Sequence, residues 1–202
     1  MDHIVRRDFI LGAALTMFGC TAVGATRPVA QTGGPSPALL RRATEAFAAH
    51  RASFDHDDRI GIVDYAAHSR EPRFYIVDRL SGNSEAFLVA HGRGSDPNHS
   101  GYLQSFSNRP GSLASSAGTY VTAQRYVGSH GASRRLRGLD PQNSNAEARA
   151  IVIHPAWYVG DSIVSQQGRL GRSEGCFALA PDDIETILDR LGDGRMIYAD
   201  KI

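Results

Sequence analysis

Two short segments of the chain carry residue types that could perform acyl-transfer chemistry. In residues 171–177, small residues precede Cys176 and could bring backbone amides close to its sulfur, as in an oxyanion hole. In residues 151–154, a β-branched run ends in His154 and is followed by Pro155, so we expect the imidazole at the end of a strand. A thiol needs a base or an imidazolium partner to form a thiolate at neutral pH. The two segments therefore predict Cys176 as a nucleophile and His154 as its base.

The cysteine content is consistent with this hypothesis. The chain has two cysteines, Cys20 and Cys176. Cys20 falls within an N-terminal segment that has the features of an export signal, and its removal or lipidation would leave Cys176 as the single thiol of the mature domain. A buried, inert cysteine is the alternative. Catalysis would explain why an exported protein keeps an unpaired thiol in an oxidising compartment.

Residues 1–25 have the pattern of an export signal. A basic segment ends in Arg6-Arg7, an apolar stretch follows, and small residues close the segment. About fifteen apolar residues are too few to span a bilayer comfortably. The arginine pair resembles a twin-arginine signal, with a general secretory signal as the alternative. Residues 17–20 loosely resemble a lipoprotein box, so we expect an exported protein of the periplasm or cell envelope, with membrane anchoring through Cys20 if that residue is lipidated.

The elements that must position the two segments come after the signal. Residues 26–36, rich in Gly and Pro, predict a linker, and residues 37–202 predict a single domain. Ser36 as N-cap and Pro37 in the first turn predict a helix that runs to about residue 54. Residues 91–118 predict a long loop. Further runs predict strands at 60–65, 73–80, 86–90, 119–123, 135–139, 150–154, 176–179 and 195–199, and a last helix at 181–191.

The fold class that this pattern indicates is mainly β with flanking helices. The formal net charge is only +1 and no basic tract is present, which argues against a nucleic-acid partner. We expect a monomer. Trp157 and Tyr158 are expected to pack in the core or in loops rather than to serve as stacking platforms.

The segment from Phe87 to Leu179 resembles the catalytic domain of murein L,D-transpeptidases, the YkuD-like family, in a divergent branch. The signature of that family is a histidine followed by Ser/Thr-x-Gly-Cys, which here is His154 and then Ser173-Glu174-Gly175-Cys176. Residues 115–120 resemble the family's entry to a strand, and residues 91–97 and 106–108 are further similar elements. Many members carry Arg two residues after the cysteine, where this chain has Ala178, so anchoring of a substrate carboxylate would fall to Arg172 or Arg93.

The resemblance implies a β-sandwich or barrel and a thiol acyl-enzyme. Cys176 would attack a diaminopimelate carbonyl of a stem tetrapeptide and release the terminal D-alanine, with His154 as proton shuttle. The thioester would pass to an amine of a second stem peptide, or to water, which would make the enzyme an L,D-carboxypeptidase or endopeptidase. Ser173 or a backbone carbonyl would orient His154, unless Ser173 is a structural turn residue. The oxyanion would be held by the amides of Gly175 and Cys176, and the substrate would be contacted by Arg172, His91 and Gly118.

Two other classes of function compete with a thiol acyltransferase. One is a zinc peptidase, but the spacing of its candidate ligands fits no zinc motif and the cysteine segment would go unexplained. The other is a non-catalytic envelope lipoprotein that binds peptidoglycan. We expect no metal and no cofactor, and peptidoglycan stem peptides as the partner. The candidate zinc ligands are His91, Asp96, His99 and His154.

Overall fold

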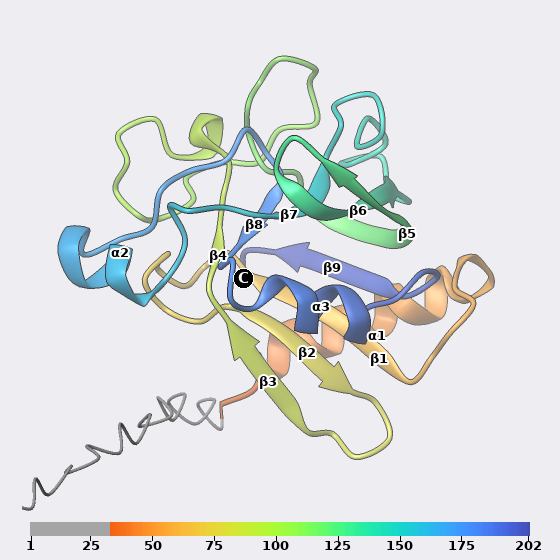
Figure 1. The fold of residues 1–202 in the computed structure, drawn as a ribbon. Helices are drawn as coiled ribbons and strands as arrows, with labels where there is room; N and C mark the ends of the chain where they lie inside the picture. Colours follow the sequence, from red (N-terminus) through yellow and green to blue (C-terminus); the bar gives the residue numbers. More distant parts are fainter. Residues whose placement is uncertain (1–32) are drawn as a thin grey trace, which may run out of the picture.

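A computed structural model describes residues 33–202 (Figure 1). The predicted export signal, Cys20 and most of the predicted linker lie outside the described residues. The strands are β1 (Arg59–Asp64), β2 (Phe74–Asp78), β3 (Ser84–Phe87), β4 (Val89–Ala90), β5 (Gly118–Gly128), β6 (Gly131–Gly138), β7 (Val152–Pro155), β8 (Phe177–Leu179) and β9 (Met196–Asp200). The helices are α1 (Pro37–Ala49), α2 (Asp161–Gln167) and α3 (Ile184–Arg190), with 3-10 turns η1 (Arg51–Ser53) and η2 (Arg93–Ser95).

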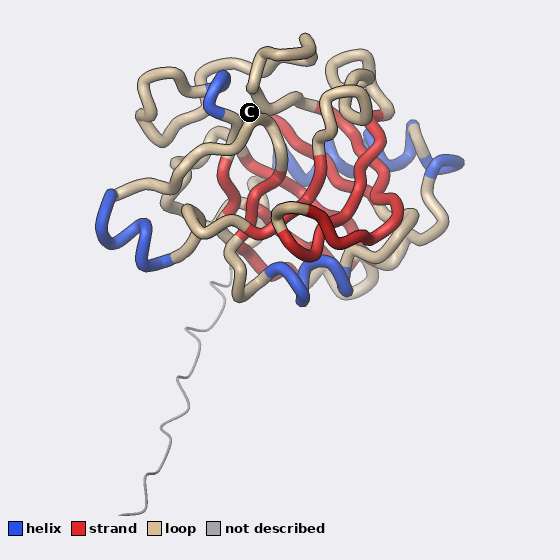
Figure 2. Tube along the Cα trace, turned by 45° about the horizontal axis from the view of Figure 1, so that its top comes forward, coloured by secondary structure: helices blue, strands red, loops and turns tan. Residues whose placement is uncertain are grey.

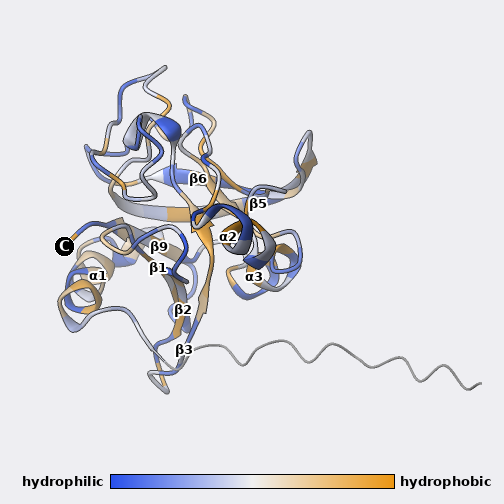
Figure 3. Cartoon of the chain, turned by 90° about the vertical axis from the view of Figure 1, so that its left-hand side faces the viewer, coloured by the Kyte–Doolittle hydropathy of each residue, from blue (hydrophilic) through white to orange (hydrophobic). Residues whose placement is uncertain are grey.

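All the strands belong to one nine-stranded sheet, in the order β3-β2-β1-β9-β5-β6-β7-β8-β4. The two edge strands, β3 and β4, are consecutive in the sequence and only Leu88 separates them. The sheet therefore curls until its two edges meet at one residue, which gives the two stacked layers visible in side view (Figure 3). This confirms the mainly β class and its sandwich-like or barrel-like form.

Helix α1 begins as its sequence predicts. Ser36 accepts a hydrogen bond on Oγ from the amide of Leu39, at 3.2 Å, and Pro37 occupies the first turn. Leu39, Ala43 and Phe47 form its buried stripe and pack on alternate residues of β1 and β9. The α-helix ends at Ala49 rather than at residue 54, and η1 completes the segment.

Helices α1 and α3 cover opposite faces of the sheet around β1 and β9 (Figure 3). Ile60 and Ile62 of β1 join the α1 cluster, whereas Val63 joins the cluster that includes Ile187 and Leu188 of α3. Alternate residues of one strand thus serve two hydrophobic clusters, because successive side chains of a strand point to opposite faces.

The position of β9 is the main topological feature that the sequence did not predict. The sequence indicated a strand at residues 195–199 without its place in the sheet. The strand lies between β1 and β5, parallel to β1 and antiparallel to β5. Its residues Met196, Ile197 and Ala199 are fully buried, as suits a strand covered on both faces.

Two further differences surround the candidate site. Strands β5 and β6 form a hairpin that extends past the predicted strand ends and turns at residues 129–130. Helix α2 occupies a stretch for which no helix was predicted, and it carries no buried residue, so it left no hydrophobic periodicity to detect. Figure 2 shows α2 projecting beyond the strands, on the side where loops gather. Over residues 33–202, no helix combines the length and apolar character that a membrane crossing requires.

Candidate functional site

Cys176 and His154 are placed by two neighbouring parallel strands. In the ladder of β7 and β8, Ile153 pairs with Phe177 and His154 pairs with Ala178. Cys176 stands one residue before β8, and its Sγ lies against the backbone at the start of β7, near Ala150 and Val152. Ile153 and Phe177 are buried in the main hydrophobic cluster. The core thus fixes the strands that present the two reactive groups.

The Cys176 thiol is partly exposed and lies against a strained backbone position. Its Sγ donates to the carbonyl oxygen of Ala150 at 3.5 Å. Ala150 has a φ of 52°, in the left-handed region that a residue with a Cβ rarely adopts. Strain of this kind gathers at functional sites. The conformation turns a carbonyl acceptor toward the sulfur.

Burial dominates the titration of the thiol. It raises the pKa of Cys176 above the ordinary value, while a hydrogen bond from the backbone of Val152 and the positive charge of Arg149 act in the opposite direction. The raised pKa leaves the sulfur as a neutral thiol at pH 7. Attack on a carbonyl then requires a base that removes the S–H proton.

His154 has the tautomer that such a base needs. Its Nδ1 lies 2.9 Å from the carbonyl oxygen of Pro155, which can only accept, so Nδ1 carries the proton and Nε2 bears the free lone pair. The ring is 4% exposed, and burial, together with the nearby His130, lowers the pKa of His154 and keeps the imidazole neutral. Among the described residues, no hydrogen bond joins His154 to Cys176. In the described part of the chain, Nε2 of His154 has no hydrogen-bond partner.

Ser173 organises the turn that carries the cysteine. Its hydroxyl donates to the carbonyl oxygen of Cys176 at 2.8 Å and accepts from the amide of Gly175 at 3.1 Å. Neither contact involves His154, which is held by Pro155 instead. The Gly175 amide already has an acceptor here, so of the two expected oxyanion donors only the Cys176 amide remains for that role.

The backbone conformation and the close neighbours of residue 175 require a glycine there. Its φ is 117°, and a Cβ at this position would lie 2.6 Å from the carbonyl oxygen of Ala114 and 3.0 Å from Nη2 of Arg149. The residue before the nucleophile is therefore packed against two loops. No side chain would fit without moving backbone.

His91 lies beneath the site rather than at its surface. Its side chain is 1% exposed; Arg73 donates to Nδ1 at 2.8 Å, and Nε2 lies 3.3 Å from a carboxylate oxygen of Asp96. Because Arg73 can only donate, Nδ1 is unprotonated and the neutral ring donates from Nε2. The backbone oxygen of His91 accepts from the amide of Ser173 at 2.9 Å. The expected substrate contact of His91 does not fit this burial; the residue supports the cysteine turn.

The remaining predicted contacts lie at the margin of the site. Arg172 donates to the carbonyl oxygens of Asp96 and Pro97, and Arg93 pairs with Glu174 at 2.7 Å on the surface. Both guanidinium groups therefore have partners within the protein. Within residues 33–202, neither forms a hydrogen bond or an ion pair with Cys176.

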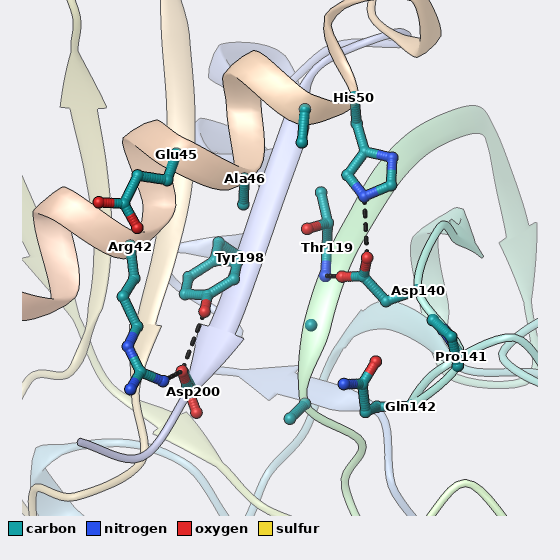
Figure 4. A pocket seen from close by; sticks show the side chains of 13 residues that line it. Arg42, Glu45, Ala46, His50, Thr119, Asp140, Pro141, Gln142, Tyr198 and Asp200 are labelled. Atoms are coloured by element: carbon teal, nitrogen blue, oxygen red, sulfur yellow. Dashed lines mark hydrogen bonds and ion pairs between the residues drawn. The ribbon is translucent and has the colours of Figure 1, made fainter.

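Gly118, predicted to contact substrate, starts β5 and lines a separate polar groove between α1 and β5 (Figure 4). Its φ is 110°, and a Cβ would meet a carboxylate oxygen of Asp140 at 2.8 Å. Asp140 also accepts from the amide of Thr119 at 2.6 Å and contacts His50 at 2.8 Å. In this groove, Gly118 allows the close approach of Asp140.

Arg149 is a site residue that the sequence pattern did not reveal. Its guanidinium donates to the carbonyl oxygen of Ser107 at 2.8 Å, to the hydroxyl of Ser116 at 2.6 Å and to the carbonyl oxygen of Ala114. It thereby fastens the long loop beside Gly175 while its charge favours the Cys176 thiolate. In the sequence, only its position five residues before His154 could have marked it as a candidate.

The candidate zinc ligands are dispersed in the structure. Nε2 of His99 donates to the carbonyl oxygen of Leu170 at 2.8 Å, whereas His91 and Asp96 pair beneath the surface. His154 faces His130. In residues 33–202, no three His, Cys, Asp or Glu side chains come together in a group that could hold a metal ion.

The chain matches a known protein family. Residues 32–199 match the family model described as L,D-transpeptidase catalytic domain. Among curated proteins, no sequence similar to this chain is found.

Several solved structures are similar to the chain at low sequence identity. An L,D-transpeptidase from Mycobacterium smegmatis is 15% identical with a TM-score of 0.44, and the match covers 71% of this chain and 58% of that one. One from Mycobacterium tuberculosis H37Rv is 13% identical with a TM-score of 0.46 and the same coverage. One from Stackebrandtia nassauensis is 14% identical with a TM-score of 0.42, covering 82% of this chain and 67% of that one. The chain spans less than two thirds of the length of the two mycobacterial structures. On the family match over residues 32–199, the chain belongs to the L,D-transpeptidase catalytic domain family.

Proposed function

We propose that the protein is a peptidoglycan L,D-transpeptidase of the cell envelope, with Cys176 as nucleophile and His154 as general base. The observation that carries the proposal is the pairing of β7 with β8, which sets a thiol beside the strand that carries a neutral imidazole with a free Nε2. The family match supports the reaction class. Catalytic hydrogen bonds are often long before substrate binds, so the absence of a bond between the two groups is compatible with this role.

The first half of the reaction forms a thioester. His154 Nε2 takes the proton of the Cys176 thiol, and the sulfur attacks the carbonyl of the third residue of a stem tetrapeptide. The amide of Cys176 donates to the oxyanion that develops. The C–N bond then breaks, the leaving amine of the terminal D-alanine takes the proton from Nε2, and the acyl group remains on sulfur.

The second half returns the enzyme to its starting state. An amine of a second stem peptide gives its proton to Nε2 and attacks the thioester, so that the new amide forms and the thiolate is released. The thiolate then recovers the proton from His154. If water takes the place of the amine, the same steps give an L,D-carboxypeptidase or endopeptidase, which is the alternative outcome.

Arg149 and Ser173 have supporting roles in this scheme. Arg149 lowers the cost of the thiolate by its charge and holds the loop that contacts Gly175. Ser173 fixes the direction of the Cys176 carbonyl and hence the orientation of the turn. Pro155, rather than Ser173, orients the base.

The test is turnover of muropeptides that carry tetrapeptide stems. We expect cross-linked dimers, resolved by mass spectrometry from trimmed monomers, and we expect chelators to have no effect. Cys176→Ala and His154→Ala should each abolish turnover, and the double variant should be no worse, because the pair acts as a unit. Turnover retained by either variant, or abolished by a chelator, contradicts the mechanism.

A carbapenem offers an independent chemical test of the nucleophile. Its strained β-lactam carbonyl should acylate the Cys176 sulfur, and peptide mapping should find a stable adduct on that residue. Cys176→Ala is the matched control and should give no adduct. An adduct on another residue would count against the assignment.

A further inference from the structure

The indole of Trp157 stands on a fixed turn directly after β7. Trp157 is the single tryptophan of the chain, and its side chain is 78% exposed, so the expectation that it packs in the core or a loop is wrong. The amide of Ala156 donates to the carbonyl oxygen of Leu179 at 2.9 Å, and the amide of Val159 donates to that of Ala156 at 3.0 Å. Ala156 and Val159 are buried on either side of the turn. The exposed ring is therefore displayed on an anchored backbone.

Tyr158 packs between this ring and the segment that leads to the nucleophile. The Trp157 and Tyr158 ring centroids are 5.8 Å apart with planes at 82°. Tyr158 fits against Gly171, where a Cβ would lie 2.6 Å from the Cβ of Tyr158. Burial raises the pKa of Tyr158 to about 12, with smaller contributions from the charges of Cys176 and Glu174. Tyr158 thus contacts both the exposed indole and Gly171, five residues before Cys176.

The surroundings of Trp157 indicate the chemistry of its ligand. Exposed polar side chains follow it within ten residues, including Asp161, Ser162 and Gln166 of α2, and no second large exposed apolar side chain lies in that stretch. A protein partner or a bilayer would require a contiguous apolar area. A pyranose ring instead offers one apolar C–H face and a rim of hydroxyls, which suits one aromatic face within a polar border.

We propose that Trp157 is a stacking platform for a pyranose ring of the glycan strand that carries the stem peptide. The inference rests on the proposed function, because that function supplies a substrate in which peptide and sugar are linked. It adds a sugar subsite beside the thiol. The enzyme would then hold its substrate at two places, the stem peptide at Cys176 and the glycan at Trp157.

Intrinsic fluorescence tests sugar binding without turnover, since only Trp157 emits as tryptophan. In Cys176→Ala protein, titration with a soluble oligomer of β-1,4-linked N-acetylglucosamine should give a saturable change in emission. Calorimetry should show that Trp157→Ala loses this binding and that Trp157→Phe, which keeps an aromatic face, retains part of it. No saturable change, or a change with lipid vesicles alone, would overturn the proposal.

Kinetics supply the second test. Trp157→Ala should raise KM for a glycan-linked tetrapeptide about threefold to tenfold relative to KM for the free tetrapeptide, as expected for one lost aromatic contact. Leu80→Ala is the matched control, because Leu80 is 91% exposed at the turn between β2 and β3. An unchanged KM ratio in Trp157→Ala contradicts the subsite. If neither substrate is turned over, the proposed function fails, and the fluorescence titration still decides whether Trp157 binds sugar.

Discussion

The ring of His130 stacks on the ring of His154, with centroids 4.4 Å apart and planes inclined by 28°. His130 comes from the turn between β5 and β6, so the tip of that hairpin covers the proposed base. The contact shields His154 from water and places a second titratable ring beside it. Both effects oppose protonation of His154, in agreement with its lowered pKa.

Replacement of His130 should therefore shift the acid limb of the profile of kcat/KM against pH. In His130→Ala, the pKa of His154 should rise, because the ring becomes more hydrated and loses a neighbour that repels its charged form. The base would then be protonated at a higher pH, and kcat/KM near pH 6 should fall severalfold while its value at pH 8 changes little. Val127→Ala, exposed on the same hairpin, controls for disturbance of the turn. An acid limb that does not move would show that His130 has no part in tuning the base.

Substitutions of Arg149 should distinguish its electrostatic role in the site from its structural role. Arg149→Met removes the positive charge, so the pKa of Cys176 should rise further and alkylation by iodoacetamide at neutral pH should slow severalfold. Arg149→Lys keeps a charge but cannot bridge the three oxygens that Arg149 binds, so it should retain more of the thiol reactivity and lose stability. Ultraviolet absorbance of the thiolate against pH gives the titration directly. Equal titrations in wild type and Arg149→Met would contradict the role.

The buried His91 should make the stability of the fold sensitive to acid. Burial and the charge of Arg73 lower the pKa of His91 to about 4, whereas the unfolded chain binds a proton there near pH 6.5. As pH falls from 6.5 to 4, the unfolded state takes up that proton first, so the free energy of unfolding should decrease, by up to about 3 kcal/mol. In His91→Asn this part of the pH dependence should disappear, whatever the stability at neutral pH.

Urea unfolding at a series of pH values measures the effect of His91. His56→Asn is a suitable control, because His56 is exposed. The result that counts is the slope of stability against pH. A slope that is the same in His91→Asn and in wild type would assign the acid sensitivity to other groups.

A glycine substitution tests whether the left-handed backbone at Ala150 is strained. Ala150→Gly should relieve a strain of about 1–2 kcal/mol and lose somewhat less through the added freedom of the unfolded chain, which leaves a net gain of about 0.5–1 kcal/mol. The thermal midpoint should rise by a few degrees. Ala48→Gly, the same change at an exposed position of α1, should destabilise. Destabilisation at both positions would mean that the Ala150 backbone is not strained.

Local signals predicted the elements that carry the reactive pair. Ser36 and Pro37 marked the start of α1, and the β-branched run before His154 marked β7, because caps and strand composition act over a few neighbouring residues. The Ser-x-Gly-Cys motif located the turn before β8. Its hydrogen bonds could not be predicted, and Ser173 binds the backbone of its own turn rather than His154.

The parts that sequence analysis missed depend on contacts between distant residues. Arg149 finds its acceptors at residues 107, 114 and 116, and His130 reaches His154 only because a hairpin folds over β7. Neither residue belongs to a periodic pattern. Trp157 is exposed because its neighbours Ala156 and Val159 are buried and hold the turn. The sequence does not reveal this, since an aromatic residue after a strand can be either buried or exposed.

The central place of β9 has a consequence for how the chain acquires its structure during synthesis. In the described residues, β9 is the strand that hydrogen-bonds both to β1 and to β5, so it joins the strands near the N-terminal helix to those that present Cys176 and His154. A ribosome makes all of these partners before it makes β9. The sheet can therefore be completed only after residues 196–200 have emerged, and the pairing of β9 with β1 closes a very long loop, which favours slow folding. Until that closure, the growing polypeptide carries the nucleophile and the base without the continuous sheet that sets their orientation.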